Sequence, residues 1–214
     1  MKSNIPTFIV VTNAKKHDVN ILDDLEFEAT SFYIMDRGYI DYIRLHQIHK
    51  SSAYFVIRAK RNLAFKVVKS HKINKETGLR CDQIIYFSSK ESREKYPSSL
   101  RRVKFYDKTT DDTYVYLTNN LEISAISVTL LYKKRWKIEL FFKWIKQHLI
   151  IKKFWGRNEN AVKTQIWVAV CNYALVHLIK NQLNLSYSTY EILEILRDSL
   201  FEQVPLYQLL INQN

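Results

Sequence analysis

Glycine and proline are scarce in this sequence, with three of each in 214 residues. Few stretches therefore qualify as linkers, and the length fits one domain or one domain with an insertion. Cysteine is also scarce: Cys81 and Cys171 stand alone, and no cysteine and histidine cluster has the spacing of a zinc site. We expect two reduced cysteines in a cytoplasmic protein rather than a disulfide framework.

Long apolar runs are missing as well. No run approaches the roughly 18 residues that cross a membrane. The first residues, MKSNIPTFIVV, lack the long apolar core and the cleavage site of a signal peptide. The sequence is nevertheless 47% hydrophobic, which is enough for a sizeable core. We therefore expect a folded protein with no membrane segment.

Acidic residues are outnumbered, because 21 Asp and Glu stand against 33 Lys and Arg and the net charge is +12. Such a balance favours a polyanionic partner, either nucleic acid or an anionic membrane surface. The excess is concentrated: residues 132–163 contain ten Lys or Arg and two Glu. Two-thirds of the net charge therefore lies in 32 residues.

The first part of the chain alternates strand-like and helix-like segments. Apolar runs predict strands at residues 6–13, 31–35 and 53–60. Helical spacing predicts short helices at residues 18–27 and 39–50. This β-α-β-α-β order is typical of an α/β sheet covered by helices.

The remainder divides into a β-rich part and a helical part. Residues 63–119 contain short β-rich runs separated by polar turns, which we interpret as an insertion subdomain. A long helix is expected from Ile123 to about Ile151, capped by Ser124 or a neighbour and ended by GRNEN at residues 156–160. Residues 161–183 predict a helix that is apolar almost all round and therefore deeply buried. Residues 187–201 predict an amphipathic helix that Ser186 or Ser188 could cap.

One carboxylate, Glu139, lies among six cationic side chains in the segment YKKRWKIELFFKWIK. On a continuous helix of about 100° per residue, Tyr132, Arg135, Glu139 and Lys146 fall within about 60° of one another along roughly 21 Å. Lys143 and Trp136 flank that line. An ordinary salt bridge is the alternative, because a cation four residues before or after a Glu is a common pairing on helices. The cationic surplus exceeds what one Glu can neutralise, which favours a functional face.

A second candidate carboxylate, Asp36, directly follows the apolar run at residues 32–35. Acids at the carboxyl end of a buried strand occupy the position where active sites of α/β sheets gather. The alternative is an Asp that forms a turn or caps the helix at residues 39–50.

These residues together resemble a known family. Tyr132, Arg135, Glu139 and Lys146 fit the pattern Y-x2-R-x3-E-x6-K, and residues 36–39 fit D-x-G-[YF]. The pair, in this order, resembles the insertion-sequence transposases of the DDE type that carry a Tyr-Arg-Glu-Lys signature. The similarity also includes FVIRAK, the β-rich insertion, and NENAVKTQIW at residues 158–167. It therefore runs over nearly the whole chain.

The resemblance implies an RNase H-like catalytic domain over residues 1–214, with 63–119 as the insertion. In that family two Asp and one Glu bind two divalent ions, Mg²⁺ or Mn²⁺, for strand cleavage and transfer at transposon ends. Asp36 would be the second acid and Glu139 the third. Phosphate contacts would come from Tyr132, Arg135, Lys146, Lys143 and Arg37.

The same resemblance implies the partners of the chain. Double-stranded DNA would be the substrate, as both transposon end and target, and a homodimer would form the synaptic complex. The expected location is the bacterial cytoplasm, at the nucleoid. Trp136 or Trp155 could stack on an unpaired base, although a place in the core is the simpler interpretation of each.

The sequence departs from the family pattern at its first acid. Asn13 ends the first apolar run without a charge, and Asp18, Asp23 and Asp24 follow in a loop or helix. None of these residues is assigned the role of the first acid. We interpret the chain as a piece of a longer transposase that is inactive alone.

Three alternatives stay open at this point. The first is a non-catalytic basic DNA-binding remnant that uses the cationic helix only for phosphate contacts. The second is a restriction-type nuclease, for which no convincing E-x-K stands on a predicted strand. The third is a membrane-surface protein, which the packed helices disfavour.

Overall fold

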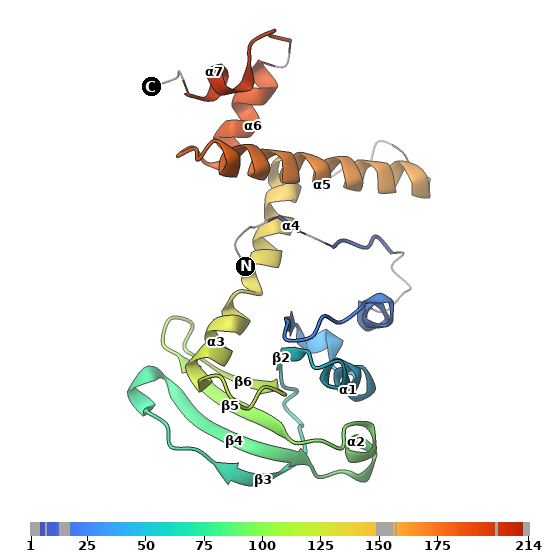
Figure 1. The fold of residues 1–214 in the computed structure, drawn as a ribbon, viewed down its shortest axis with the longest axis vertical. Helices are drawn as coiled ribbons and strands as arrows, with labels where there is room; N and C mark the ends of the chain where they lie inside the picture. The colour runs from blue at the N-terminus through green and yellow to red at the C-terminus, as the bar shows by residue number, and fades with distance from the viewer. Residues whose placement is uncertain are drawn as a thin grey trace. The chain divides into compact units, whose positions relative to one another are not determined.

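The computed structural model describes residues 5–6, 8–12, 18–148, 156, 158–199 and 201–211, with the backbone alone at Leu206 and Ile211. The chain divides into two compact units. We call residues Thr12–Trp136 the sheet unit, and Met1–Val11 with Lys137–Asn214 the helical unit. Each unit has its own hydrophobic clusters (Figure 1).

A mixed six-stranded sheet forms the centre of the sheet unit, in the order β1-β2-β6-β5-β4-β3. Strands β1 and β2 pair in parallel, and every other neighbouring pair is antiparallel. The predicted α/β architecture, consistent with an RNase H-like core, is confirmed. The strand bounds are β1 Phe32–Met35, β2 Tyr54–Arg58, β3 Phe65–Ser70, β4 Leu79–Phe87, β5 Leu100–Asp107 and β6 Asp112–Thr118.

The strand predicted at residues 6–13 is wrong where the structure describes it, because residues 8–12 form no strand. Residues 7 and 13 lie outside the described part. An apolar run becomes a strand only when a neighbouring strand pairs with it. Ile9 packs instead with the helical cluster around Phe141 and Tyr173.

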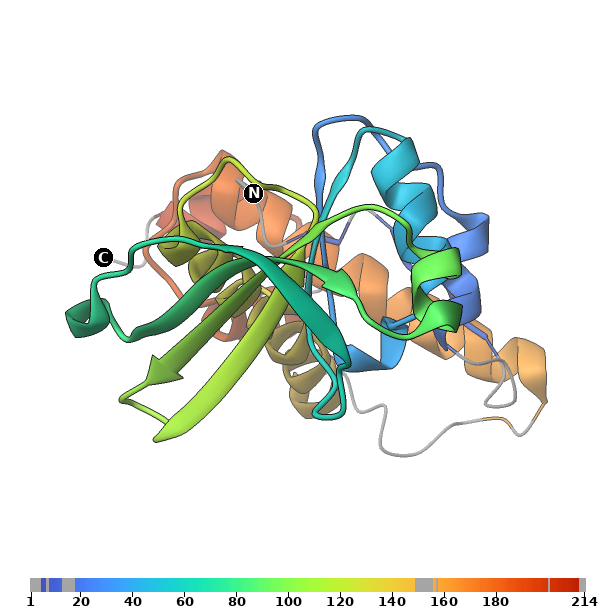
Figure 2. The same cartoon turned by 90° about the horizontal axis from the view of Figure 1, so that it is seen from below.

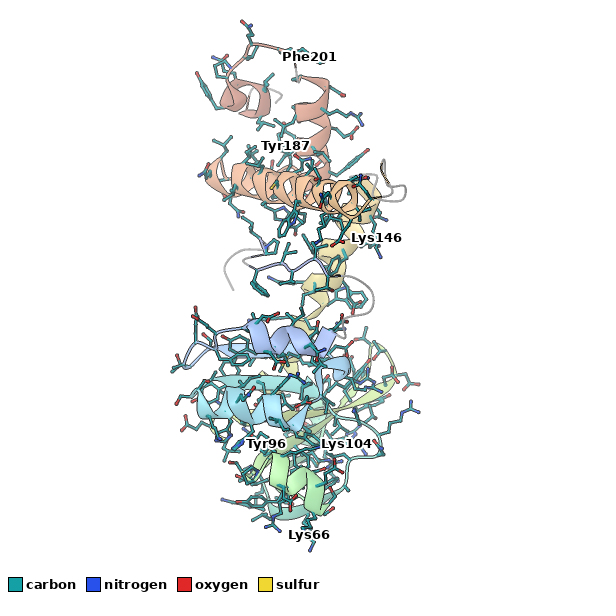
Figure 3. The ribbon with its side chains drawn as sticks, turned by 90° about the vertical axis from the view of Figure 1, so that its right-hand side faces the viewer. Lys66, Tyr96, Lys104, Lys146, Tyr187 and Phe201 are labelled. Carbon is teal, nitrogen blue, oxygen red and sulfur yellow. The ribbon has the colours of Figure 1, made fainter. Side chains whose placement is uncertain are left out.

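Helices cover both faces of this sheet (Figures 1 and 2). On one face lie α1 Tyr42–Lys50 and α2 Lys90–Lys95, whose cluster includes Leu45, Phe55 and Tyr96. Tyr96, labelled in Figure 3, is fully buried. Its Oη lies 2.7 Å from Nδ1 of His49. The opposite face packs against α3 Ala125–Lys133. Three short 3₁₀ helices complete the unit: η1 Asp18–Asp24, η2 Arg37–Tyr39 and η3 Lys75–Thr77.

A buried ion pair links β4 and β5. Arg101 donates from Nε to Asp82 Oδ1 at 2.7 Å and from Nη2 to Asp82 Oδ2 at 2.8 Å, and both side chains are about 5% exposed. Arg101 also donates to the carbonyl of Ile123, just before α3. Two parallel hydrogen bonds therefore hold the two charges together.

The side chain of Asn119 continues the ladder beyond the end of β6. Its Oδ1 accepts from the Phe55 amide at 2.9 Å, and its Nδ2 donates to the Ala53 carbonyl at 2.8 Å. One side-chain amide thus provides hydrogen-bond partners for two backbone groups, one in β2 and one in the residue just before it.

Four helices belong to the described part of the helical unit: α4 Trp136–His148, whose first residue is the last of the sheet unit, α5 Glu159–Gln182, α6 Thr189–Asp198 and α7 Leu206–Ile211. Asn158 caps α5. Ser188 caps α6 in a capping box with Glu191, and this confirms one of the two predicted caps.

The long helix predicted from Ile123 to Ile151 is wrong as one element. It consists of α3 and α4, separated by a turn at Lys134 and Arg135. The amides of these two residues donate to the carbonyls of Leu131 and Tyr132, three residues back, so the α-helical ladder stops. Ser124 caps α3 as predicted, and residues 149–151 lie outside the described range.

The prediction that α5 is deeply buried is also wrong. Ala169, Tyr173, Val176 and His177 are buried, whereas Trp167, Val168, Leu175 and Leu178 are 43–55% exposed. Packing by the described residues therefore covers one side of this apolar helix. By length and composition alone α5 could cross a membrane, a criterion that core helices of other proteins also meet.

Candidate functional site

Asp36 stands at the end of β1, where the chain leaves the sheet. It is the N-cap of η2, and its Oδ1 accepts a hydrogen bond from the Arg37 amide. The turn-forming interpretation is therefore confirmed, whereas the interpretation as the cap of the following helix is wrong, because Asp41 caps α1. The Asp36 carboxylate is also exposed. Because β1 and β2 are parallel, this position is the carboxyl end of the parallel pair, where sites of α/β sheets form.

Tyr132 is a buried residue of the sheet unit. Its ring lies 4.7 Å from that of Tyr116, centroid to centroid, within the cluster between α3 and the sheet. Burial raises the pKa of the Tyr132 hydroxyl, the negative charge of Asp36 adds to the rise, and Arg135 and Arg58 oppose it. These charges therefore act on one hydroxyl, and the first half of the signature shares an electrostatic environment with the D-x-G-[YF] motif.

Arg135 lies in the turn between the two helices. Its Cζ is 5.7 Å from the centroid of the Tyr132 ring, and the side chain is partly buried. The predicted single line of four residues on one continuous helix is therefore wrong. Tyr132 belongs to α3, Arg135 to the turn, and Glu139 with Lys146 to α4.

Within the helical unit, Glu139, Lys143 and Lys146 share one face of α4. Together with Phe142 and Gln147 they line an open pocket of about 480 Å³. Glu139 is partly buried, and both lysines are exposed. The structure thus brings together the second half of the signature and the predicted flanking residue Lys143.

The other candidates have different outcomes. Trp136 is 58% exposed, so its interpretation as a core residue is wrong, and its stacking role stays a prediction. Trp155 and Asn13 lie outside the described residues. Asp18, Asp23 and Asp24 belong to η1, where Asp23 forms a salt bridge of 2.6 Å with Arg44.

The donor set for a metal ion is incomplete within the described residues. Three or more His, Cys, Asp or Glu side chains are nowhere grouped closely enough in this part of the chain to hold an ion. Asp36 and Glu139 belong to different units. Their oxygen chemistry suits Mg²⁺, but the described residues of neither unit form a complete metal site.

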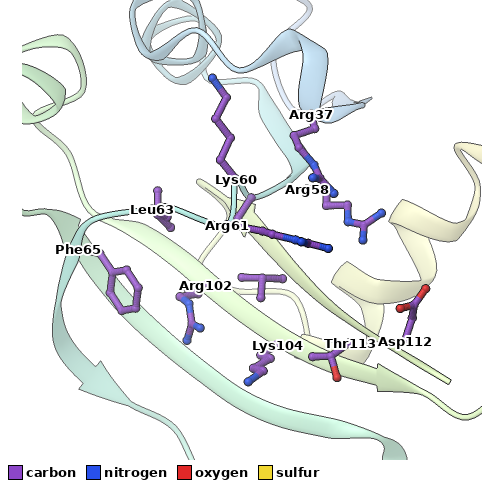
Figure 4. A pocket seen from close by; sticks show the side chains of 12 residues that line it. Arg37, Arg58, Lys60, Arg61, Leu63, Phe65, Arg102, Lys104, Asp112 and Thr113 are labelled. Atoms are coloured by element: carbon purple, nitrogen blue, oxygen red, sulfur yellow. The ribbon is translucent and has the colours of Figure 1, made fainter.

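A cationic groove in the sheet unit was missed by the sequence analysis. Its volume is about 310 Å³, and it lies beside the end of β2 (Figure 4). Among the lining residues are Arg37, Arg58, Lys60, Arg61, Arg102 and Lys104, with Asp112 as the one acidic residue of the lining. A partial signal was available: Arg102 and Lys104 are two apart on a strand and so point to the same face. No sequence pattern linked them to Lys60 and Arg61.

Comparison with known proteins identifies the family. The Transposase DDE domain matches residues 1–175. The protein y4zB of Sinorhizobium fredii, described as a transposase, is 37% identical over 180 residues, which are 82% of this chain and 50% of y4zB. A transposase described for the insertion sequence element IS5377 of Geobacillus stearothermophilus is 30% identical, over 86% of this chain and 50% of its own length.

A third relative, described for the insertion sequence element IS4SA of Synechocystis, is 28% identical over 84% of this chain and 51% of its own. The chain therefore spans about half the length of the curated relatives it matches. The family match covers more than half of the chain and includes every candidate residue in both units. The chain belongs to the DDE transposase family, and two of these relatives are described as transposases of insertion sequence elements.

Proposed function

We propose that this chain takes part in metal-dependent cleavage and transfer of DNA strands at transposon ends. The observation that carries the proposal is the common environment of Asp36, Tyr132 and Arg135. They come from the two separate motifs that define the resemblance. Cζ of Arg135 lies 5.7 Å from the centroid of the Tyr132 ring, and the charge of Asp36 contributes to the raised pKa of the Tyr132 hydroxyl.

Each residue has a specific role in this proposal. Asp36 and Glu139 supply carboxylates for Mg²⁺ or Mn²⁺, which when bound would activate the attacking hydroxyl and stabilise the leaving oxygen. Arg135, Lys143 and Lys146 hold backbone phosphates, as does Arg37 beside Asp36. Tyr132 positions Arg135, because its ring is fixed in the core while the guanidinium lies beside it.

The chain alone is expected to be inactive and to bind Mg²⁺ weakly, because the described residues assemble no group of three ligands. Isothermal titration of the pure chain with MgCl₂ should therefore show no saturable tight site. Robust Mg²⁺-dependent cleavage of a transposon end by the pure chain, abolished by Glu139→Gln, would contradict this expectation.

A chimera tests the catalytic roles. The chain is fused to the part of y4zB that it does not match, and nicking of a plasmid that carries transposon ends is measured. We expect Mg²⁺-dependent nicking that Asp36→Asn and Glu139→Gln each abolish, with unchanged DNA binding. Glu26→Gln is the matched control, because Glu26 is an exposed carboxylate of the sheet unit outside both motifs. Full nicking by Asp36→Asn would remove the proposed role.

A second candidate function is a non-catalytic DNA-binding remnant. The cationic groove and the incomplete donor set favour it. This function predicts salt-sensitive DNA binding that Asp36→Ala leaves unchanged, with no nicking in the chimera. Dimerisation in a synaptic complex belongs to the transposase proposal, and light scattering of the chimera with transposon ends would test it.

A further inference from the structure

The cationic groove of the sheet unit has a charge pattern that indicates a binding site not included in the transposase signature. Six of its lining side chains are cations, and one is a carboxylate. Pockets for small organic ligands are mostly apolar, with a few polar groups. This lining therefore favours an anion as the occupant.

Most of the cations are not neutralised inside the protein. Among the residues that the structure describes, Arg37, Lys60, Arg61 and Lys104 form no salt bridge. Lys60 and Arg61 are exposed, and Arg37 and Lys104 are partly exposed. Like charges held close together repel one another, so a bound polyanion would relieve the repulsion.

Backbone pairing in the sheet fixes the positions of the residues that carry these charges. The amide of Ala59 donates to the Val115 carbonyl at 2.8 Å, which ties the end of β2 to β6. Val115 is in register with Lys104 on β5, so both side chains stand on one face of the sheet. Lys60 and Arg61 directly follow the tied residue, and Figure 4 shows them above Arg102 and Lys104.

The aromatic ring in the lining of the groove, that of Phe65, already has a cation over it. The guanidinium of Arg102 lies 4.7 Å from the centroid of this ring. The arginine occupies the face on which a base would otherwise stack, and the other charged side chains of the lining are cations apart from Asp112. Recognition here is therefore directed at phosphates, which carry no sequence information.

We propose that this groove, with Lys60, Arg61, Arg102 and Lys104 at its centre, binds the phosphate backbone of DNA without sequence preference. None of its lining residues belongs to the Tyr-Arg-Glu-Lys signature, and one of them, Arg37, belongs to the D-x-G-[YF] motif. The inference rests on the proposed function for its choice of DNA as the polyanion. It requires neither a metal ion nor catalysis.

The test is fluorescence anisotropy of the full chain with a labelled duplex of random sequence, in EDTA, across a salt series. The double variant Lys60→Gln/Arg61→Gln should bind more weakly and should lower the slope of log K against log salt by about 2, which is about 1 for each phosphate that is no longer neutralised. A duplex with transposon-end sequence should bind equally well. Lys104→Gln should lower the slope by about 1.

The matched control is Lys50→Gln/Lys90→Gln, which removes the same charge from exposed positions outside the groove. An equal loss of slope in this control would show a bulk charge effect and would overturn the proposal. Equal affinity for poly-glutamate at the same salt would overturn the choice of DNA. Circular dichroism of each variant must match the parent chain, and a misfolded double variant is replaced by Lys104→Gln.

The outcomes separate this site from the proposed function. Glu139→Gln should keep the parent slope in EDTA, because α4 contributes nothing to this groove. If the chimera fails to nick DNA but the slope change is present, the groove stands and the catalytic proposal fails. If nicking succeeds but Lys60→Gln/Arg61→Gln binds as the parent does, the groove proposal fails alone.

Discussion

The two units support their candidate residues in opposite ways. In the sheet unit Tyr132 is buried against Tyr116, and Asp36 caps a 3₁₀ helix at the end of a strand. In the helical unit Glu139, Lys143 and Lys146 stand on an open face of α4. Tyr132 is therefore part of the core, Arg135 and Glu139 are partly buried, and Lys143 and Lys146 are exposed.

This difference predicts that substitutions within one motif should differ in how much they change stability and how much they change function. A buried side chain contributes to stability through packing, so its replacement alters both folding and function. A surface side chain that serves a ligand changes function with little effect on stability. The following predictions test whether the sheet unit is the more tightly constrained of the two.

The largest effect is expected from Arg101→Met. This variant leaves the buried Asp82 carboxylate without its partner, and breaking a buried pair in this way lowers the free energy of unfolding by about 3–5 kcal/mol. Urea denaturation gives the size, and hydrogen exchange should show the loss over residues 65–118. Arg93→Met, at an exposed arginine of α2, should stay within about 0.5 kcal/mol of the parent. Equal stability of the two variants would refute the prediction.

An intermediate loss of folding stability is expected at acidic pH. Burial opposes ionisation of Asp82, but the hydrogen bonds from Arg101 and the neighbouring His71 outweigh it and hold the pKa of Asp82 below its ordinary 3.8. The ionised carboxylate therefore stabilises the fold above that value, and this contribution is lost as the pH falls through the lowered pKa.

The measurement for this prediction is the urea midpoint as a function of pH. In the parent chain the sheet unit should lose stability below about pH 4. Asp82→Asn should be less stable at neutral pH and should lack that acid-dependent part. Glu94→Gln, at an exposed carboxylate, should retain it. An unchanged acid profile in Asp82→Asn would show that another group governs the transition.

The smallest effect is expected in the helical unit, from Ser188→Ala. The variant removes the capping-box acceptor of α6 and should lower stability by about 1 kcal/mol. Faster hydrogen exchange should appear over residues 189–198 and not over 65–118. Ser186→Ala is the matched control, since Ser186 is an exposed serine two residues earlier that does not cap the helix. Loss of protection in both units would show that they unfold together.

Much of the fold was predictable because its signals are local. The strands at β1, β2 and β3–β6 follow from apolar runs and polar turns, and the Ser124 and Ser188 caps follow from the helix starts. The residues of α2 carry no such pattern, because KESREK is polar throughout and its helix depends on the Ser89 cap and the buried Tyr96 beside it.

The failures have tertiary causes. Lys134 and Arg135 are good helix formers, so nothing local marks the break between α3 and α4. Tyr132, just before them in the chain, packs against Tyr116 of the sheet, a contact that the helical wheel cannot contain. The candidate residues themselves were found by motif spacing. Their division between two units and the groove around Arg102 depend on strand order, which the sequence pattern does not determine.

The side chain of Asn119 has a consequence for how this sheet can vary. It forms hydrogen bonds with both the Phe55 amide and the Ala53 carbonyl, so it fixes the position of the end of β6 relative to the start of β2. The lengths of the loops between β3 and β6 can change without disturbing these two hydrogen bonds. A single residue inserted between Thr118 and Asn119 would shift the amide along the strand and leave both backbone groups unsatisfied. The sheet should therefore tolerate length variation in its hairpins and reject it at this one junction.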